Sequence, residues 1–388
     1  MLPPSEIALA HSRSVQAMIR EKILAANNWI SFEDYMNLAL YAPGMGYYSS
    51  GATKLGSAGD FVTAPEISPL FGRTLAQQLW QISQHLAQFN ILEFGAGSGK
   101  LARDILLELE KTAALPEKYF ILEVSADLRE RQQSHLMQEI PHLANRIEWL
   151  EQLPGQFTGV ILANEVLDAM PVHIVRWHDD TVLERGVTWQ NDQFTWQDRA
   201  IQDKELLTIA QQLAPEVSPD NQPIDYVSEV NLAAVHFMRS LASTLQQGVI
   251  LLIDYGFGRS EYYHPQRSQG TLMCHYRHHA HDDPFYLPGL QDITSHVDFS
   301  TITQAGQSGG LALLGYTTQA YFLLNCGITE ILAQTSVEDT SQYLPQSNQL
   351  QKLVSPAEMG ELFKVIAFGK NFFEPLSGFN SGDMSRRL

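Results

Sequence analysis

Three glycines at alternating positions give residues 91–99 the features of a ligand-binding loop. Residues 91–94 are typical of a buried strand, and Gly95, Gly97 and Gly99 follow them. The next residues carry apolar side chains at helical spacing. Glycine lets a backbone pass close to a ligand, and the N–H groups at the start of a helix attract negative charge. The segment therefore predicts a nucleotide-type site, and the alternative for a glycine pair alone is a plain tight turn.

The position of the third glycine separates the candidate cofactors. Dinucleotide-binding loops follow the pattern G-x-G-x-x-G, but Lys100 stands where that pattern has its last glycine. Glu93, two residues before the first glycine, can bind an ammonium group, and the loop amides can bind a carboxylate. Glu123 ends the next predicted strand and can accept hydrogen bonds from both hydroxyls of a ribose. An amino acid and a ribose in one ligand favour S-adenosyl-L-methionine (SAM) over a nicotinamide cofactor.

Two carboxylates follow the strand predicted at residues 159–164. Glu165 and Asp168 stand three residues apart, next to Asn164, at the sheet edge where open α/β sheets bind ligands. Methyl transfer requires an oriented acceptor and a group that takes its proton or balances its charge. Paired carboxylates match the planar, permanently charged guanidinium of arginine. We predict that Glu165 and Asp168 are catalytic and that Asn164 lies at the cofactor, with helix capping as the alternative for either acid.

Three further residues are weaker candidates for substrate contacts. Asp254 and Tyr255 end another predicted strand on the same edge, and Asp60 lies in a glycine-rich loop that looks poised to fold over the site. Ordinary turn chemistry is the alternative for Asp60 and Asp254. The histidine-rich run at 274–283 lacks the paired spacing of zinc ligands, so we predict no metal and a hydrogen-bonding loop there.

Composition narrows the classes of partner. The chain has 388 residues, 44% of them apolar, which is enough for a large core. Its 25 Lys and Arg against 43 Asp and Glu give a net charge of −18, which argues against nucleic acid and favours a basic acceptor. The two cysteines form neither a disulfide framework nor a C-x-x-C motif. No segment has the length of a membrane span or the features of a secretory signal, so the expected compartment is the cytoplasm.

The elements that must position these residues alternate between helix and strand. Such alternation predicts an α/β fold with a mostly parallel sheet covered by helices on both faces. We expect strands at 90–94, 119–124, 146–150, 159–164 and 248–254, with 320–324 and 362–368 as a final hairpin that makes seven. Helices are expected within 12–42 and at 70–86. A hairpin at 173–196 and a largely helical stretch at 206–245 interrupt the pattern.

This pattern divides the chain into three parts. Residues 1–88 form an N-terminal helical cap with a substrate or lid loop, and residues 89–370 form the cofactor domain. That domain contains an insertion at 173–246 and a His- and Tyr-rich loop at 255–307, and residues 371–388 form a tail.

The ordered motifs resemble those of the MidA family of SAM-dependent methyltransferases, over residues 30–370. They are YMNLALY at 35–41 with GYY at 46–48, GDFVTAPEIS at 59–68, EFGAGSG at 93–99, NE at 164–165 with Asp168, DYG at 254–256, QDIT at 291–294 and VDF at 297–299. The resemblance implies a class I, Rossmann-like methyltransferase core with an N-terminal helical cap and a family-specific insertion around the acceptor cleft.

The resemblance also implies an activity and its residues. The family is associated with symmetric dimethylation of an arginine on a subunit of respiratory complex I. By position, Gly95, Gly97, Gly99 and Glu123 would hold SAM, and Glu165 and Asp168 would face the acceptor. No mitochondrial presequence is evident, as expected for a bacterial-type member.

Three hypotheses follow for the function. The leading one is a SAM-dependent protein methyltransferase that acts on arginine. The second is a small-molecule methyltransferase whose pocket the loop at 255–307 would enclose. The third is a non-catalytic assembly or binding protein that keeps the methyltransferase fold.

Overall fold

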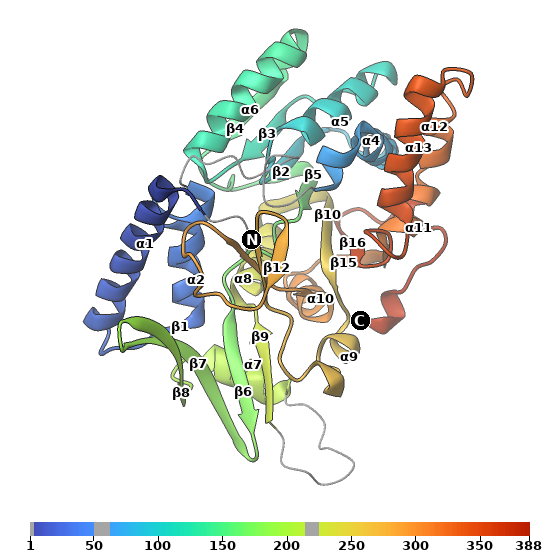
Figure 1. The fold of residues 1–388 in the computed structure, drawn as a ribbon. Coiled ribbons are helices and arrows are strands. Elements are labelled where there is room, and N and C mark those ends of the chain that lie inside the picture. The colour runs from blue at the N-terminus through green and yellow to red at the C-terminus, as the bar shows by residue number, and fades with distance from the viewer. Residues whose placement is uncertain (1–3, 50–62, 214–224) are drawn as a thin grey trace.

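A mixed sheet crosses the middle of the molecule in the computed structural model, which describes residues 4–49, 63–213 and 225–388 (Figure 1). Its strand order is β15-β16-β10-β5-β2-β3-β4. Five of these strands run parallel: β2 (Ile91–Phe94), β3 (Tyr119–Leu122), β4 (Ile147–Leu150), β5 (Phe157–Asn164) and β10 (Leu245–Phe257). The antiparallel strands β15 (Ala312–Thr318) and β16 (Phe363–Lys370) complete one edge, and β14 (Val297–Asp298) pairs in parallel with the last residues of β10. The predicted α/β class is confirmed.

Both faces of this sheet are buried, which explains why its strands are almost continuously apolar. Successive residues of β2 show the alternation, because Ile91 packs into the core on one face and Leu92 into the core on the other. Val160 and Ile161 of β5 divide in the same way.

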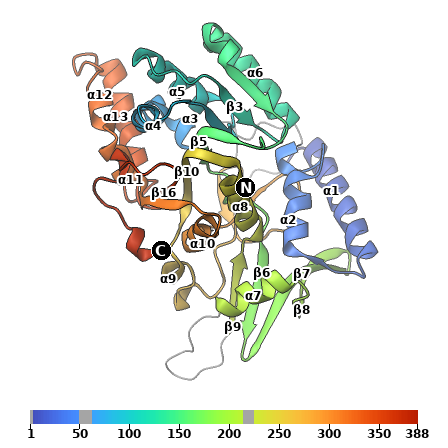
Figure 2. The same cartoon turned by 180° about the vertical axis from the view of Figure 1, so that it is seen from behind.

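Helices cover the two faces in two layers, which Figures 1 and 2 show from opposite sides. One face carries α4 (Pro69–Ser83), α5 (Lys100–Lys111), α6 (Ala126–Glu139), α11 (Gln319–Asn325), α12 (Ile328–Leu332) and α13 (Thr340–Val354). The other face carries α8 (Leu232–Thr244) and α10 (Phe299–Ser308). The short helices are α3 (Ala64–Ile67), α9 (Arg259–Tyr262) and the 3-10 turns η1 (Tyr47–Ser49), η2 (Pro141–Arg146), η3 (Pro265–Arg267), η4 (Ser377–Phe379) and η5 (Ser385–Arg387).

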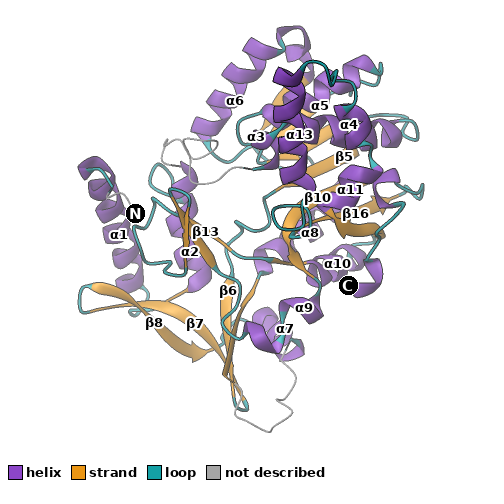
Figure 3. Ribbon diagram, turned by 45° about the vertical axis from the view of Figure 1, so that its right-hand side comes forward, coloured by secondary structure: helices purple, strands orange, loops and turns teal. Residues whose placement is uncertain are grey.

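The N-terminal helices pack against a second, antiparallel sheet at one side of the molecule (Figure 3). These helices are α1 (Glu6–Ala25) and α2 (Phe32–Tyr41). The sheet contains β1 (Ile30–Ser31), β6 (His173–His178), β7 (Thr181–Gln190), β8 (Gln193–Ala200) and β9 (Asp225–Val230), and α7 (Lys204–Gln212) packs against it in a small core of its own. A three-stranded sheet of β11 (Met273–Tyr276), β12 (His279–His281) and β13 (Asp292–Thr294) joins the cap core through Cys274 and Ile293. Segments distant in sequence thus share one cap.

The structure corrects three of the predicted elements. The segment predicted as a His- and Tyr-rich loop at 255–307 contains α9, β11 to β14 and α10, most of them too short to show a periodicity in the sequence. Residues 320–324 are not a strand; they lie in α11, and β15 is the strand that pairs with β16. Phe322 and Leu323 are buried while Tyr321 and Leu324 are exposed, which is a helical and not an alternating pattern. The stretch predicted as largely helical at 206–245 contains the strand β9 between its two helices. The predicted hairpin is present, with Asp179 and Asp180 at the turn between β6 and β7, and β8 extends it.

Candidate active site

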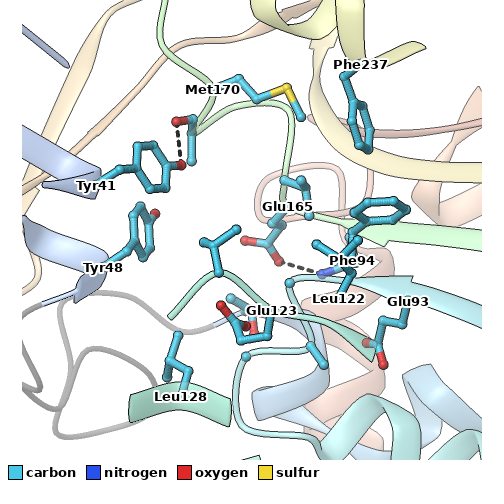
Figure 4. Close-up of a pocket in the computed structure, with 18 of the residues that line it drawn as sticks. Tyr41, Tyr48, Glu93, Phe94, Leu122, Glu123, Leu128, Glu165, Met170 and Phe237 are labelled. Carbon is cyan, nitrogen blue, oxygen red and sulfur yellow. Dashed lines mark hydrogen bonds between the residues drawn. The ribbon is translucent and has the colours of Figure 1, made fainter. Parts of the chain in front are cut away.

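A cavity of about 720 Å³ opens at the carboxyl edge of the parallel strands. Its walls come from the glycine loop after β2, from the residues that follow β3, β4 and β5, and from the cap (Figure 4). The strand order reverses between β2 and β5, because β3 lies on the far side of β2 and β10 on the far side of β5. Open α/β sheets bind their ligands at such a point.

The glycine loop has a backbone that other residues rarely adopt. Gly95, Gly97 and Gly99 have φ angles of +61°, +55° and +83°, in the left-handed region. A Cβ on Gly95 would also lie 3.2 Å from the Val166 side chain. Gly95 and Gly97 line the cavity, and Gly99 is the N-cap of α5. The loop therefore presents its backbone to the cavity at the start of a helix.

The two glutamates predicted at the cofactor have different surroundings. Glu123 lines the cavity and accepts hydrogen bonds from the Ser125 N–H at 2.9 Å and from Gln132 Nε2 at 3.0 Å. Glu93 also reaches the cavity wall but is only 2% exposed, and the Tyr119 hydroxyl donates to it at 2.8 Å. Burial raises the pKa of Glu93 to about 7. Glu123 is thus the better placed of the two to meet a polar ligand from the cavity.

Glu165 stands at the centre of the cavity in Figure 4. Its φ of +54° is unusual for a residue other than glycine and turns the chain sharply at the end of β5. Oε1 accepts hydrogen bonds from the Ala64 N–H at 3.4 Å and from Asn164 Nδ2 at 3.3 Å. Burial, followed by repulsion from Asp168, raises the pKa of Glu165 to about 8. The side chain is therefore poised to lose a proton when a cation arrives.

Asp168, Asp254 and Tyr255 lie behind the loop that carries Glu165 and are not among the described residues that line the cavity. Asp254 Oδ2 accepts three successive backbone N–H groups, from residues 166, 167 and 168, at 3.2, 2.9 and 3.2 Å. The Tyr255 hydroxyl donates to Asp168 Oδ2 at 2.5 Å. Burial raises the pKa of both Asp168, to about 6, and Asp254. These residues are placed to shape the loop. The loop continues to β6 without forming a helix, so neither Glu165 nor Asp168 caps one there.

The cap contributes two tyrosines to the cavity that were not predicted as site residues from the sequence. Tyr41 and Tyr48 line the cavity, and their rings are stacked with 5.4 Å between the ring centroids. The Tyr41 hydroxyl donates to the Ala169 carbonyl at 2.8 Å and the Tyr48 hydroxyl to Asp292 Oδ1 at 2.9 Å. Gln152 and Leu153 also line the cavity just after β4, and their place at a strand end was the signal that could have identified them.

The short helix α3 connects the two loops of the site. Its first residue, Ala64, donates to Glu165, while the Glu66 carboxylate accepts hydrogen bonds from Ser98 Oγ in the glycine loop and from Lys100 Nζ. The Glu66 side chain is only 8% exposed. Asp60, the predicted substrate contact before this helix, lies outside the described residues.

The charged side chains on the cavity wall are all acidic among the residues that the structure describes. Glu66, Glu93, Glu123 and Glu165 reach the wall, and it includes no Lys, Arg or His from the described ranges. Lys100 pairs with Glu66 from outside this lining. A cavity of this composition suits ligands that carry positive charge.

Comparison with known proteins identifies the family to which this site belongs. The model of the family described as "Putative S-adenosyl-L-methionine-dependent methyltransferase" matches residues 71–317. The chain belongs to this methyltransferase family. A crystal structure of a Burkholderia thailandensis protein bound to S-adenosyl-homocysteine is 47% identical, covers 100% of both chains and superposes with a TM-score of 0.95. A native structure of a Burkholderia thailandensis protein, also 47% identical, superposes with a TM-score of 0.92.

Curated relatives of this methyltransferase are also similar over most of their length. The Bos taurus protein arginine methyltransferase NDUFAF7, mitochondrial, is 29% identical over an alignment of 403 positions, which covers 92% of this chain and 84% of the bovine protein. The Drosophila melanogaster homolog is 27% identical over an alignment of 412 positions, which covers 95% of this chain and 89% of the Drosophila protein. The predictions of a SAM-dependent methyltransferase and of SAM as its cofactor are confirmed.

The residues of this methyltransferase cavity fit SAM in charge. The sulfonium and ammonium groups of SAM are positive and match the acidic wall, and Gly95 and Gly97 bring the backbone of the glycine loop to the cavity. Glu123 follows β3 with its carboxylate held by two donors, which suits it to accept from ribose hydroxyls.

Three other features of the methyltransferase concern metals, cysteines and membranes. Within the described residues, no group of three or more His, Cys, Asp or Glu side chains is arranged to hold a metal ion, and residues 274–283 fall in β11, β12 and the turns beside them. Both cysteines are buried and free. None of the described helices combines the length and apolarity that crossing a membrane requires.

Proposed function

We propose that this methyltransferase transfers the methyl group of SAM to an arginine side chain of a protein partner, with Glu165 as the residue that receives the guanidinium. The single observation that carries the proposal is the acidic wall of the cavity, in which Glu165 lies at the centre (Figure 4). A guanidinium stays charged at all physiological pH values and forms paired hydrogen bonds with carboxylates. The curated relatives are named as protein arginine methyltransferases, which supports the same acceptor.

Glu165 has the properties that this acceptor requires. SAM, when bound, supplies the activated methyl group. The Glu165 carboxylate then accepts hydrogen bonds from the guanidinium and orients one of its nitrogens towards that group. Since burial raises the pKa of Glu165 to about 8, the carboxyl loses its proton as the cation binds, and the new ion pair stabilises the ionised form.

Asp168 and Tyr255 support this arrangement from behind the loop. The hydrogen bond from Tyr255 fixes one carboxylate oxygen of Asp168. Asp168 thereby helps to hold the loop that carries Glu165, without itself reaching the guanidinium. By family resemblance, we propose a subunit of the respiratory complex I type as the protein that carries the arginine.

The test is methyl transfer to proteins from cells that lack this gene. Purified enzyme and SAM labelled in its methyl group are added to the extract, which is then separated into protein and low-molecular-weight fractions. We expect label in a protein band and methylarginine in its mass spectrum. Label confined to the low-molecular-weight fraction supports a small-molecule methyltransferase instead. Binding of S-adenosyl-homocysteine without any transfer supports the non-catalytic assembly protein.

A further inference from the structure

Gln132 is a fully buried glutamine on α6 whose side-chain amide connects three parts of the cofactor site. Nε2 donates to Glu123 Oε2 at 3.0 Å and to the Gly97 carbonyl at 3.1 Å. Oε1 accepts a hydrogen bond from the Trp149 indole N–H at 3.0 Å. One side chain thus holds the acid that follows β3, the centre of the glycine loop and a tryptophan of β4.

The chemistry of the three partners allows only one orientation of this amide. The Glu123 carboxylate and the Gly97 carbonyl only accept hydrogen bonds, whereas the indole N–H of Trp149 only donates. A primary amide supplies two donors and one acceptor, which matches the three partners without any left over. A glutamate at position 132 would place a second acid against Glu123, and a leucine would leave all three partners without this bond.

Packing keeps the amide in place beside the loop. Helix α6 begins at its N-cap Ser125, two residues after Glu123, and the Ser125 backbone N–H holds the other oxygen of that carboxylate. At the far end of the loop, a Cβ on Gly99 would lie 3.4 Å from Leu136 and 3.7 Å from the Cα of Gln132. The loop and α6 are therefore in close contact, while Gln132 itself is not among the described residues that line the cavity.

We propose that Gln132 is a positioning residue for the cofactor, which sets the orientation of the Glu123 carboxylate and of the Gly97 peptide that SAM meets. The inference rests on the proposed placement of SAM against Glu123 and the glycine loop. It assigns a role in cofactor affinity to a residue outside the cavity. Methyl transfer at saturating SAM does not depend on it.

The experiment compares Gln132→Leu and Gln132→Glu with the same two substitutions at Gln138, an exposed residue of the same helix. Calorimetry with S-adenosyl-homocysteine gives the Kd of each variant, and thermal unfolding shows that each is folded. We expect the Kd to rise about tenfold or more for both Gln132 variants, since a buried acceptor loses its donor. The Gln138 variants are expected to bind like the wild type.

Two further measurements separate positioning from a general loss of structure. The KM for SAM should rise with the Kd for Gln132→Leu, while kcat at saturating SAM, measured with the extract, stays within about threefold of the wild type. Trp149→Phe removes only the indole N–H that donates to Gln132 Oε1, and it should raise the Kd by a smaller factor.

The outcomes are separable from those of the proposed function. An unchanged Kd in both Gln132 variants, or a fall in kcat with an unchanged KM, overturns the inference. Failure of the wild type to bind S-adenosyl-homocysteine would overturn the placement of SAM itself. The acceptor, arginine or another, does not enter the binding measurement.

Discussion

At the scale of single residues, Glu165 combines properties that an exposed acid lacks. Its backbone is in the left-handed region at φ +54°, its Oε1 accepts from Ala64, and burial raises its pKa to about 8. A strained backbone and a perturbed acid at one position are typical of functional sites. Asp168, three residues on, also has a raised pKa, but it lies behind the loop and is not among the described residues that line the cavity.

Replacement of Glu165 by glutamine tests the role of its charge. Glutamine keeps an oxygen that can accept from the Ala64 N–H but cannot ionise, so it cannot balance a guanidinium. We expect methyl transfer to fall by about 100-fold or more, and the Kd for S-adenosyl-homocysteine to stay within about threefold. Glu117→Gln, at an exposed position, is the matched control. A Glu165→Gln enzyme that retains more than half of its activity would contradict the proposed role.

The pH dependence of acceptor turnover follows from the raised pKa of Glu165. Below about pH 8 the free enzyme holds a proton on this carboxyl, and the proton must leave before the acid can pair with a cation. The kcat/KM for the acceptor should therefore rise with pH up to about 8 and then level off, since this ratio reports groups of the free enzyme. In Glu165→Gln the residual rate should lack this limb. The same limb in both enzymes would assign it to another group.

The raised pKa of Glu165 also makes the stability of the fold depend on pH, in the opposite direction to its effect on activity. A carboxyl whose pKa is raised from 4.5 in the native state contributes most to stability below pH 4.5 and loses this contribution as the pH rises to about 8. The buried, ionised Glu165 carboxylate therefore costs stability at the pH where the proposed catalysis is fastest. Buried acids at active sites commonly show this trade between stability and function.

At the scale of elements, α3 is the connection between the two loops of the site. It is only four residues long, yet it contacts Glu165 through Ala64 and the glycine loop through Glu66. It continues through Ser68 into α4, which packs so closely on α5 that a Cβ on Gly72 would lie 2.7 Å from that of Asp104. The end of α3 that leads into α4 is thus held by the core of the cofactor domain.

Loss of the Glu66 carboxylate should loosen this connection. In Glu66→Ala the Lys100 ammonium and the Ser98 hydroxyl lose their acceptor. Because Lys100 is 36% exposed, we expect the free energy of unfolding in urea to fall by only about 1 kcal/mol. The Kd for S-adenosyl-homocysteine should rise in the same variant. Glu139→Ala, which removes an exposed partner 3.9 Å from Arg103, should change neither quantity; an equal effect of both variants would remove the special role of α3.

At the scale of the whole molecule, the cavity lies between the cap and the cofactor domain. The hydrogen bonds of Tyr41 with Ala169 and of Tyr48 with Asp292 join segments that are 128 and 244 residues apart. The cap core is shared by α1, α2, the five-stranded sheet and β11 to β13, which lie together beside the main sheet (Figures 1 and 3). This cap holds Tyr41 and Tyr48 on the wall of the cavity.

The net charge of −18 predicts how salt affects a basic protein acceptor. Long-range attraction speeds the encounter of such an acceptor with the acidic enzyme, and salt screens it because the Debye length falls from about 10 Å at 0.1 M to about 3 Å at 1 M. We expect kcat/KM for the protein acceptor to fall several-fold over this range. The Kd of S-adenosyl-homocysteine, which has no net charge, should change little. Equal salt dependence of the two quantities would argue against electrostatic steering.

The sequence alone determined the features that depend on local backbone chemistry. The glycines at 95, 97 and 99 indicated a loop with an unusual backbone, and these residues do have left-handed φ angles. The alternation of apolar strands and amphipathic helices indicated the α/β class. The order of these motifs also led to the methyltransferase family. Local sequence could not assign residues 320–324 correctly, because the periodicity of a short apolar run does not separate a strand from a buried helix.

Only the tertiary structure decided which of the predicted polar residues face the cavity. Glu165 points inward while Asp168 and Asp254 lie behind it, because the φ of Glu165 and the three N–H groups bound by Asp254 set the path of the loop. The tertiary structure also brought Tyr48 to the cavity and Gln132 behind the glycine loop, through hydrogen-bond partners that are 244 and up to 35 residues away in the chain. A side chain's direction at the end of a strand depends on contacts made by distant segments, and those contacts exist only when the chain has folded.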